Sequence, residues 1–241
     1  MNAQVVTVSH KRPTQPYYKF GTFIESLRRF AETPAVLGYG ASWNGLMTKA
    51  FLYRDWLRAK KNSSDRLILC DAWDIVFSKH PHGIGDRCQE WFGDAIVFNG
   101  EKACWPKGHL SELYPDTGVW RFLNSGIMCG PADRILAMFE AMNLESIGVD
   151  RTEGGKKIEP NDQGEIQEFF TKQPKDIKMV VDGGCKLFQT LSACDLGEFD
   201  LDGEHIVNKV TGTEPSVWHF NGGSKGHIMQ VMHKKWNLEH N

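Results

Sequence analysis

The sequence predicts an α/β fold, with helices covering a central sheet. Two patterns support this prediction: short apolar runs alternate with segments of helical periodicity through about the first hundred residues, and two of these runs end in acidic residues. A third observation is size, because 241 residues with 41% hydrophobic content can bury one sizeable core. Ligand sites of such sheets gather at the carboxyl ends of the strands, so the acidic ends mark the expected site.

The first half of the chain supplies four expected strands and two expected helices. A β-branched run at 5–8 stops before a proline-containing segment, and the apolar residues at 23, 24, 27 and 30 have helical spacing. In RLILCDAWDIVF, a buried strand runs into two acids, and DAIVFNGE repeats the plan. The expected strands lie at 5–8, at 35–40, within 66–77 and within 94–101, and the expected helices lie at 22–30 and 46–59.

The second half has a different character. RFLNSGIMCGP reads as a strand with turn residues, and an amphipathic helix follows it. The charged, glycine-rich segment 148–161 predicts a mobile loop. The expected elements are a strand at 121–131, helices at 132–142 and 162–170, strands near 178–182, 187–191 and 216–220, and a basic tail with His227, His233 and Lys234. No repeat or long linker interrupts the chain, which predicts one domain over 1–241.

Charge and cysteine usage exclude several classes of protein. Lysine and arginine number 28 against 30 acidic residues, so no global positive field draws the chain to nucleic acid or membrane. The six cysteines are scattered without a CxxC pair, which favours reduced thiols. The N-terminus lacks the pattern of a secretory leader, and no stretch reaches the roughly 20 apolar residues of a membrane span. We therefore expect a soluble, cytoplasmic protein.

The two acids after the third strand are candidate metal ligands. Asp71 and Asp74 would repel each other unless a cation or another partner lies between them, and carboxylate oxygens suit Mg²⁺ or Mn²⁺. Trp73, between the two acids, could offer a flat face to a base or a sugar. The alternatives are that one acid caps the following segment while the other is solvated, and that the tryptophan is simply core.

A second motif, SVWHFNGGSKG, lies near the C-terminus. His219 could complete a metal site, the backbone of Gly222 and Gly223 could approach a diphosphate closely, and Lys225 could neutralise it. The alternative is an ordinary strand followed by a tight turn. Taken together, two acids, one histidine, a Gly-Gly turn and a lysine are what a metal-bound nucleotide diphosphate requires.

The chain also resembles the N-terminal glycosyltransferase domain of the procollagen lysyl hydroxylases. Eight elements appear in the same order: LGYGASWNG, LILCDAWDIVF, FNGEKACWP, ELYPDTG, RFLNSG, NDQ, KLFQTL and WHFNGGSK. This resemblance implies a GT-A-type fold, a Rossmann-like mixed sheet flanked by helices, which uses a UDP-sugar with Mn²⁺. It also implies a nucleotide-binding half over about 1–120 and an acceptor half over about 121–241.

The resemblance assigns roles to individual positions of this chain. It implies that Asp71, Asp74 and His219 hold the metal and that Trp73 stacks on the uracil. It implies a diphosphate-contacting turn at Gly222 and Lys225. It implies that Thr7 lies at the end of the first strand, where the nucleoside sits, and that Lys49 is the cofactor-binding lysine on the following helix. It also implies that Trp105 lies in a loop lining the sugar and acceptor pocket and Asn124 in the motif below it.

Two further acids, Glu101 and Asp162, belong to that pocket by resemblance. Asp162 could bind the transferred sugar, activate an acceptor hydroxyl, or do both; alternatively, it could cap the helix that follows it. The chain departs from the family at two places. A single Asn161 precedes Asp162 where the family has an acidic run, and EKA enters CWP in place of a small-aromatic pattern. The first departure counts against a mechanism that needs adjacent carboxylates, and the second leaves the acceptor open.

The leading hypothesis is a metal-dependent glycosyltransferase that moves a hexose from UDP-glucose or UDP-galactose to a hydroxyl group. Hydroxylysine is the acceptor that the resemblance implies, and a saccharide is another. The main alternative is transfer to hydroxymethylated pyrimidine bases in DNA, for which KKNSSDR, Lys156 with Lys157, and the HKKW tail could form basic patches. Two further alternatives are a non-catalytic nucleotide-sugar-binding module and a metal phosphohydrolase. Because no hydroxylase segment follows, we expect a stand-alone transferase.

Overall fold

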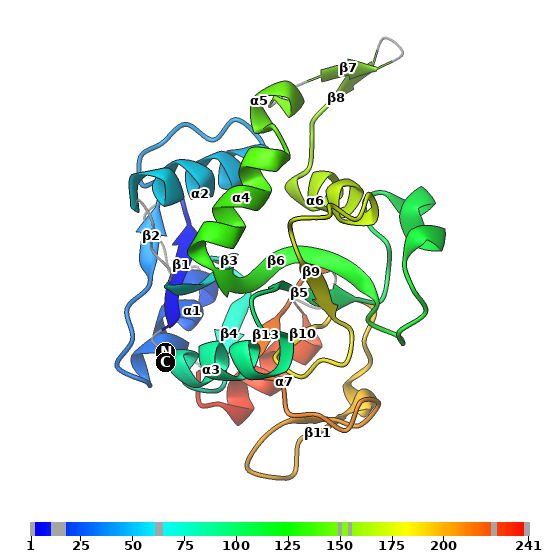
Figure 1. The fold of residues 1–241 in the computed structure, drawn as a ribbon. Helices are drawn as coiled ribbons and strands as arrows, with labels where there is room; N and C mark the ends of the chain where they lie inside the picture. Colours follow the sequence, from blue (N-terminus) through cyan, green and yellow to red (C-terminus); the bar gives the residue numbers. More distant parts are fainter. Residues whose placement is uncertain are drawn as a thin grey trace.

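A computed structural model describes residues 3–10, 18–60, 65–148, 151–153, 156–222 and 226–238. Its centre is a six-stranded sheet in the order β2-β1-β3-β6-β5-β9 (Figure 1). The strands of this sheet are β1 (Ala3–Val8), β2 (Ala35–Leu37), β3 (Arg66–Asp71), β5 (Ile96–Glu101), β6 (Phe122–Pro131) and β9 (Met179–Asp182). Only β6 runs against its neighbours, since β1, β2 and β3 pair in parallel, β5 and β9 pair in parallel, and β6 lies antiparallel to both β3 and β5.

Helices cover both faces of this sheet (Figure 1). One face packs on α2 (Met47–Lys60), α4 (Ala132–Ala141) and α6 (Asp162–Thr171). The opposite face packs on α1 (Tyr18–Arg28) and α3 (Pro81–Phe92). The remaining short helices are α5 (Leu144–Ile147), η1 (Gly108–Leu113) and η2 (Leu196–Glu198). The mixed sheet with flanking helices that the sequence predicted is therefore present.

Side-chain alternation along the central strands explains the two-faced burial. Leu67 and Leu69 of β3 belong to the core under α2 and α4, whereas Ile68 and Cys70 of the same strand belong to the core under α1 and α3. Successive side chains of a strand point to opposite faces, so a strand covered on both sides must be apolar at every position. This requirement is why RLILC carries no polar alternation after Arg66.

A second, three-stranded sheet carries the C-terminal motif. It consists of β10 (Phe188–Thr190), β13 (Val217–His219) and β4 (Ile75–Phe77). One side contributes to the core under α1 and α3, and the other packs on α7 (His227–Lys235) through Trp218, Phe220 and Trp236. Two hairpins complete the fold: β7 (Arg151–Glu153) with β8 (Lys156–Ile158), and β11 (Phe199–Asp200) with β12 (Val207–Asn208).

The structure differs from the sequence prediction at four places. No sequence pattern predicted α3, which begins with Pro81 at its first turn and His80 as its N-cap. The segment 148–161, predicted as a loop, contains the β7–β8 hairpin. The run 66–77 is two strands belonging to two different sheets. The predicted basic tail forms α7, in which His233 is buried against Phe220. The split of 66–77 between two sheets depends on tertiary packing that local periodicity does not report, whereas α3 and α7 carry helical spacing of apolar residues that was overlooked.

All six cysteines have free thiols. Across the described residues, no helix combines the length and the apolar character that crossing a bilayer requires.

Candidate active site

A cavity of about 620 Å³ opens at the carboxyl ends of β1, β3 and β5. These three strands run in the same direction, so their last residues meet at one edge of the sheet, where α/β proteins bind ligands. The cavity brings together ten of the thirteen residues that the sequence singled out: Lys49, Asp71, Trp73, Asp74, Glu101, Trp105, Asn124, Asp162, His219 and Gly222.

Three of these side chains form a possible metal site, which we call the cavity cluster: Asp71, Asp74 and His219. Their candidate ligand atoms all lie within 4.8 Å of one another. His219 Nε2 is 3.8 Å from Asp71 Oδ2 and 3.6 Å from Asp74 Oδ1. Two carboxylates and one imidazole can together hold a divalent cation such as Mn²⁺. These three side chains therefore lie close together, as the sequence predicted.

Strand pairing between distant segments places the histidine beside the acids. Asp71 is the last residue of β3, and the chain then turns into β4, which pairs antiparallel with β13. This register sets His219 opposite Ile75, and the amide N–H of Phe220 donates to the carbonyl of Asp74 over 2.8 Å. The two acids and the imidazole therefore converge because β13 adds to β4.

The imidazole of His219 is fixed from behind. The Nδ1 atom of His219 lies 3.3 Å from the side-chain amide of Asn99. In the amide orientation that satisfies the surrounding groups, the amide nitrogen of Asn99 donates to the carbonyls of Asn124 and Ile127. The amide oxygen then faces Nδ1, which leaves Nε2 for the acids. A Cβ at Gly126 would lie 2.1 Å from Cε1 of the ring, so the glycine in RFLNSG makes room for this histidine.

A buried ion-pair network continues from Asp71. Lys49 Nζ lies 2.8 Å from Asp71 Oδ1 and 2.8 Å from Asp162 Oδ2, and the lysine side chain is only 13% exposed. Burial alone would lower the pKa of Lys49, but the carboxylates of Asp162 and Asp71 outweigh it and raise that pKa. The pKa of Asp71 is also raised, first by its removal from water and then by Asp74, although Lys49 opposes both effects.

Asp162 faces the cavity and does not cap its helix. The N-cap of α6 is Asn161, whose Oδ1 accepts from the backbone N–H groups of Gln163 and Gly164. The capping alternative for Asp162 is therefore wrong: Asn161 already satisfies the exposed N–H groups of the first turn. The carboxylate of Asp162 instead accepts from Ser125 Oγ over 2.7 Å and pairs with Lys49.

Glu101 is held by side-chain amides on both carboxylate oxygens. Asn221 Nδ2 donates to Oε1 over 2.6 Å, while Asn124 Nδ2 and Gln163 Nε2 donate to Oε2 over 2.9 and 3.2 Å. The carboxylate is 5% exposed. Among the described residues, three neutral amides thus donate to the carboxylate and hold it in the cavity wall.

Aromatic side chains form the rim of the cavity. Trp105 is 57% exposed on the loop after β5, and its carbonyl accepts from Gln167 Nε2 over 3.0 Å, which ties the loop to α6. Trp43 stacks on His10 with ring centroids 5.1 Å apart. Sequence reasoning assigned no role to Trp43, His10, Gln163 or Asn221, all of which line the cavity. Trp43, Gln163 and Asn221 lie in the quoted motifs LGYGASWNG, NDQ and WHFNGGSK, so these motifs were the signal that could have identified them.

The other three predicted residues are Thr7, Gly223 and Lys225, of which Gly223 lies outside the described residues. Thr7 is fully buried, and its hydroxyl donates to the carbonyl of Cys70 over 2.7 Å, so its side chain ties β1 to β3; Val8 and His10 line the cavity instead. Lys225 lies outside the described residues. Gly222 does line the cavity, in a left-handed conformation with φ of 56°, and an added Cβ would meet Ser192 Oγ at 2.9 Å.

Comparison with known proteins agrees with this geometry. The chain is 29% identical over 240 residues to the multifunctional procollagen lysine hydroxylase and glycosyltransferase of Caenorhabditis elegans, covering 90% of this chain and 31% of that protein. It is 29% identical over 233 residues to the procollagen-lysine,2-oxoglutarate 5-dioxygenase of Drosophila melanogaster, covering 88% and 30%. The chain thus spans about a third of the length of these relatives.

A solved structure and a family model complete the comparison. The apo form of mouse xyloside xylosyltransferase 1 shares the fold, with a TM-score of 0.56 and 12% identity, covering 93% of this chain and 99% of that one. This likeness confirms the predicted GT-A-type α/β architecture. The model described as the PLOD GT domain matches residues 1–240. The chain therefore belongs to the PLOD GT domain family, the glycosyltransferase domain found in procollagen lysyl hydroxylases.

Proposed function

We propose that this chain transfers a hexose, glucose or galactose, from a UDP-sugar to a hydroxyl group in a reaction that depends on Mn²⁺. The observation that carries this proposal is the convergence of the cavity cluster at the edge of a cavity of about 620 Å³. Family membership supports glycosyl transfer in general, and the donor set of the cluster supports the metal.

The residues of the cavity cluster fit Mn²⁺ well. Manganese accepts both carboxylate oxygen and imidazole nitrogen, whereas Mg²⁺ prefers oxygen ligands alone. The pKa of Asp71 is raised because its carboxylate is buried and lies beside the carboxylate of Asp74. A bound cation would offset both effects. When bound there, Mn²⁺ supplies positive charge to the diphosphate as the sugar departs.

Other residues of the cavity are suited to the nucleotide. Trp73 lies between the two acids and lines the cavity, where its ring can stack on uracil. The backbone at Gly222 can approach a diphosphate closely, because no Cβ covers it. Lys49 holds the carboxylates of Asp71 and Asp162 in fixed positions. We retain Lys225 as a proposed diphosphate partner on the basis of the motif alone.

The far side of the cavity is suited to the sugar and the acceptor. Asp162 and Glu101 are each only 5% exposed. We propose that their carboxylates orient the transferred hexose. Asn124 acts through Glu101, to which it donates. The exposed indole of Trp105 offers an apolar face to the acceptor. His219 comes from the second half of the chain, so the proposed nucleotide-binding half over 1–120 needs it to complete the metal site.

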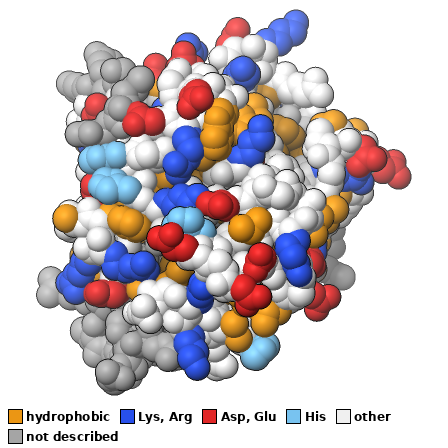
Figure 2. All heavy atoms as spheres, turned by 90° about the horizontal axis from the view of Figure 1, so that it is seen from below, with side chains coloured by type: hydrophobic (Ala, Val, Ile, Leu, Met, Phe, Trp, Pro, Cys, Tyr) orange, Lys and Arg blue, Asp and Glu red, His pale blue; other side chains and the backbone are white. Residues whose placement is uncertain are grey.

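Hydroxylysine is the proposed acceptor. The name of the nematode relative couples procollagen lysine hydroxylation with glycosyl transfer. Hydroxymethylated DNA remains the competing acceptor, but the charges do not favour it. Among the described residues on the face drawn in Figure 2, acidic and basic side chains are interspersed without a continuous basic area. Residues 61–64 of KKNSSDR and the side chains of Lys156 and Lys157 lie outside the described part of the chain. His233 of the HKKW segment is buried, so it cannot contribute to such a patch.

A UDP-release assay across several UDP-sugars with Mn²⁺ tests the proposal. We expect release from UDP-glucose or UDP-galactose that increases when a hydroxylysine peptide is added and disappears when the metal is chelated. An increase with hydroxymethylated duplex alone would transfer the assignment to DNA. Binding of UDP-sugar without release under any condition would indicate a non-catalytic module, and phosphate release from simple esters would indicate a phosphohydrolase.

A further inference from the structure

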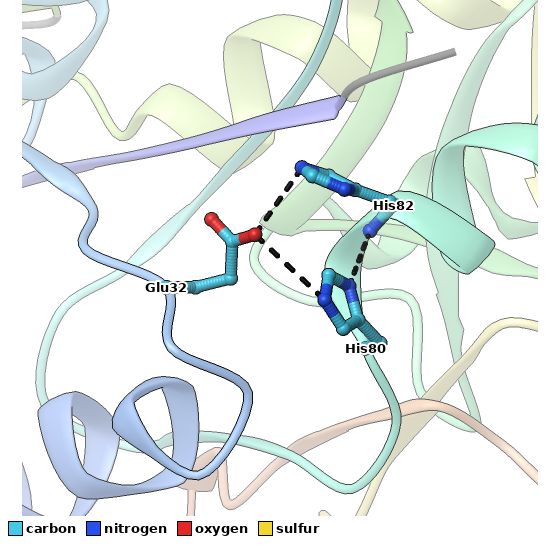
Figure 3. A group of neighbouring side chains, drawn as sticks. All are labelled: Glu32, His80 and His82. Carbon is cyan, nitrogen blue, oxygen red and sulfur yellow. Dashed lines mark hydrogen bonds and ion pairs between the residues drawn. The ribbon is translucent and has the colours of Figure 1, made fainter.

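A second group of metal-ligating side chains lies outside the cavity. Figure 3 shows Glu32, from the segment that follows α1, pointing toward the imidazoles of His80 and His82 at the start of α3. We call these three residues the surface cluster. None of them lines the cavity. Their candidate ligand atoms all lie within 4.8 Å of one another, as in the cavity cluster.

The two distances from the carboxylate to the imidazoles are close to those of a metal site, and all three candidate ligand atoms lie within 4.8 Å of one another. Glu32 Oε1 is 3.2 Å from His82 Nε2 and 3.9 Å from His80 Nε2. Ligand atoms about 2.1 Å from a tetrahedral Zn²⁺ lie about 3.4 Å from one another. The carboxylate therefore needs to shift by only a few tenths of an ångström relative to each imidazole. The side chains of Glu32, His80 and His82 are 24%, 45% and 38% exposed, so an ion can reach them from solvent.

We propose that Glu32, His80 and His82 bind one divalent transition-metal ion, with Zn²⁺ as the best match to their ligand chemistry. Two imidazoles and one carboxylate are a nitrogen-rich donor set, which favours Zn²⁺ over Mg²⁺ or Mn²⁺. Water fills the fourth position. The carboxylate supplies negative charge at the start of α3, which offsets the repulsion between a cation and the positive end of the helix dipole.

Binding has a specific consequence for the cap of α3. The backbone N–H of His82 donates to His80 Nδ1 over 3.2 Å, so Nδ1 is the acceptor and the neutral ring carries its proton on Nε2. Ligation through Nε2 requires that this proton leave Nε2 and that another bind Nδ1, with no net change in protonation. The metal-bound ring can then no longer accept from His82. Metal binding is thus coupled to loss of this one capping hydrogen bond.

The surface cluster joins two segments that are about fifty residues apart in sequence. Helix α1, which ends four residues before Glu32, and helix α3, which begins at the histidines, pack on the same face of the central sheet. An ion shared between the two segments would fasten them together. The proposed role is therefore structural: the bound metal stabilises the folded chain in proportion to its occupancy.

Zn²⁺ titration of the full chain tests this proposal. We expect His82→Gln and His80→Ser each to weaken one Zn²⁺ site by about tenfold or more, because even partners outside the ligand shell contribute that much. Serine is itself a good N-cap, so His80→Ser removes the ligand while it preserves the start of α3. The thermal midpoint of the unmutated chain should rise with Zn²⁺, and this rise should shrink in both variants.

The matched control is His205→Gln, which removes an exposed imidazole elsewhere on the surface and should leave Zn²⁺ binding unchanged. A readout without mutation is the proton–nitrogen correlation spectrum of the imidazoles. On addition of Zn²⁺, His80 should change from the Nε2-protonated to the Nδ1-protonated form, and the amide of His82 should exchange faster. Unchanged Zn²⁺ stoichiometry and affinity in both cluster variants, or unchanged His80 and His82 signals, would overturn the proposal.

Discussion

The cavity cluster and the surface cluster each bring three possible ligands together, yet the molecule supports them very differently. Around the cavity cluster, Lys49 pairs with Asp71, Asn99 orients the imidazole of His219, and Gly126 makes room for it. Around the surface cluster, the described support is the capping bond between His80 and His82 and ring contacts with Phe30. In a catalytic metal site, surrounding contacts fix the orientation of each ligand. A site without such contacts can at most hold an ion.

The donor atoms differ in the same direction. The cavity cluster offers two carboxylates and one imidazole among buried polar groups, whereas the surface cluster offers one carboxylate and two imidazoles in contact with water. The first set suits Mn²⁺ beside a diphosphate, and the second suits Zn²⁺. The two clusters should therefore respond differently to mutation and to metal.

The largest effect is expected from Asp74→Ala. Loss of one of two carboxylates should lower Mn²⁺-dependent UDP release about 1000-fold, because the charge that develops on the diphosphate loses its cation. The fold should survive, since the backbone carbonyl of Asp74 keeps its bond to Phe220. The control is His82→Gln, which should leave UDP release intact. Equal losses in the two variants would break the distinction between the clusters.

Gly126→Ala tests the support behind the histidine. The added Cβ would lie between 2.1 and 2.9 Å from three atoms of the His219 ring, so the imidazole must move. We expect about a hundredfold loss in kcat/KM and a fall of about 1–3 kcal/mol in the free energy of unfolding. Gly184→Ala is the matched control, because a Cβ there meets nothing closer than 3.8 Å. Wild-type activity in Gly126→Ala would show that the position of His219 is not critical.

Trp105→Ala tests the acceptor side of the cavity. The residues of the surface cluster do not line this cavity. The indole is 57% exposed, so its removal should leave the free energy of unfolding nearly unchanged. We expect kcat/KM for the acceptor to fall about tenfold, while UDP binding measured by calorimetry stays the same. Equal losses in both measurements would place the indole in the nucleotide pocket instead.

The smallest effect concerns the ion pairs that hold the Trp105 loop on α6. Hydrogen bonds from Lys107 and Lys172 lower the pKa of Glu168 to about 2, against an ordinary value of 4.5. Because the folded-state pKa is the lower one, the stabilisation is complete above about pH 4.5 and is lost as the pH falls toward 2. The side chain is 38% exposed, so we expect less than about 0.5 kcal/mol.

Glu168→Gln measures this contribution. The variant should unfold at a slightly lower urea concentration at pH 7, and the difference should vanish near pH 2. A difference that persists or grows in acid would mean that the ion pairs are not its cause. Lys172→Gln is the companion variant, because it removes the more exposed of the two lysine partners.

Local sequence patterns predicted the central part of the fold well. The runs LILC (67–70) and IVF (96–98) are apolar at every position, which indicates strands buried on both faces, and the structure confirms them as parts of β3 and β5. Position at strand ends then predicted that Asp71 and Glu101 would face the ligand edge, and both line the cavity. Sequence reasoning overlooked α3, although Ile84, Cys88 and Phe92 have helical spacing. It could not predict the β7–β8 hairpin, since such short charged strands carry weak periodicity.

Local patterns could not settle which side chains do what within a motif. In NDQ, either Asn161 or Asp162 could cap the helix, and only the packing of α6 against β6 shows that the asparagine does so while the aspartate meets Lys49 and Ser125. Similarly, Thr7 ends the first strand as predicted, but the pairing of β1 with β3 turns its hydroxyl toward Cys70 and away from the cavity. Hydrogen-bond partners come from neighbouring strands, which a local pattern does not contain.

The sequence by itself determined the family, the strands that end in acids and the identity of the cavity cluster, because buried strands and ordered motifs leave a local record in the residue types. Only the tertiary structure decided that the chain also joins Glu32 to His80 and His82, that amides hold Glu101, and that Asn161 caps α6. The physical reason is that these contacts join segments far apart in sequence, and their geometry is set by how helices and strands pack around a shared core.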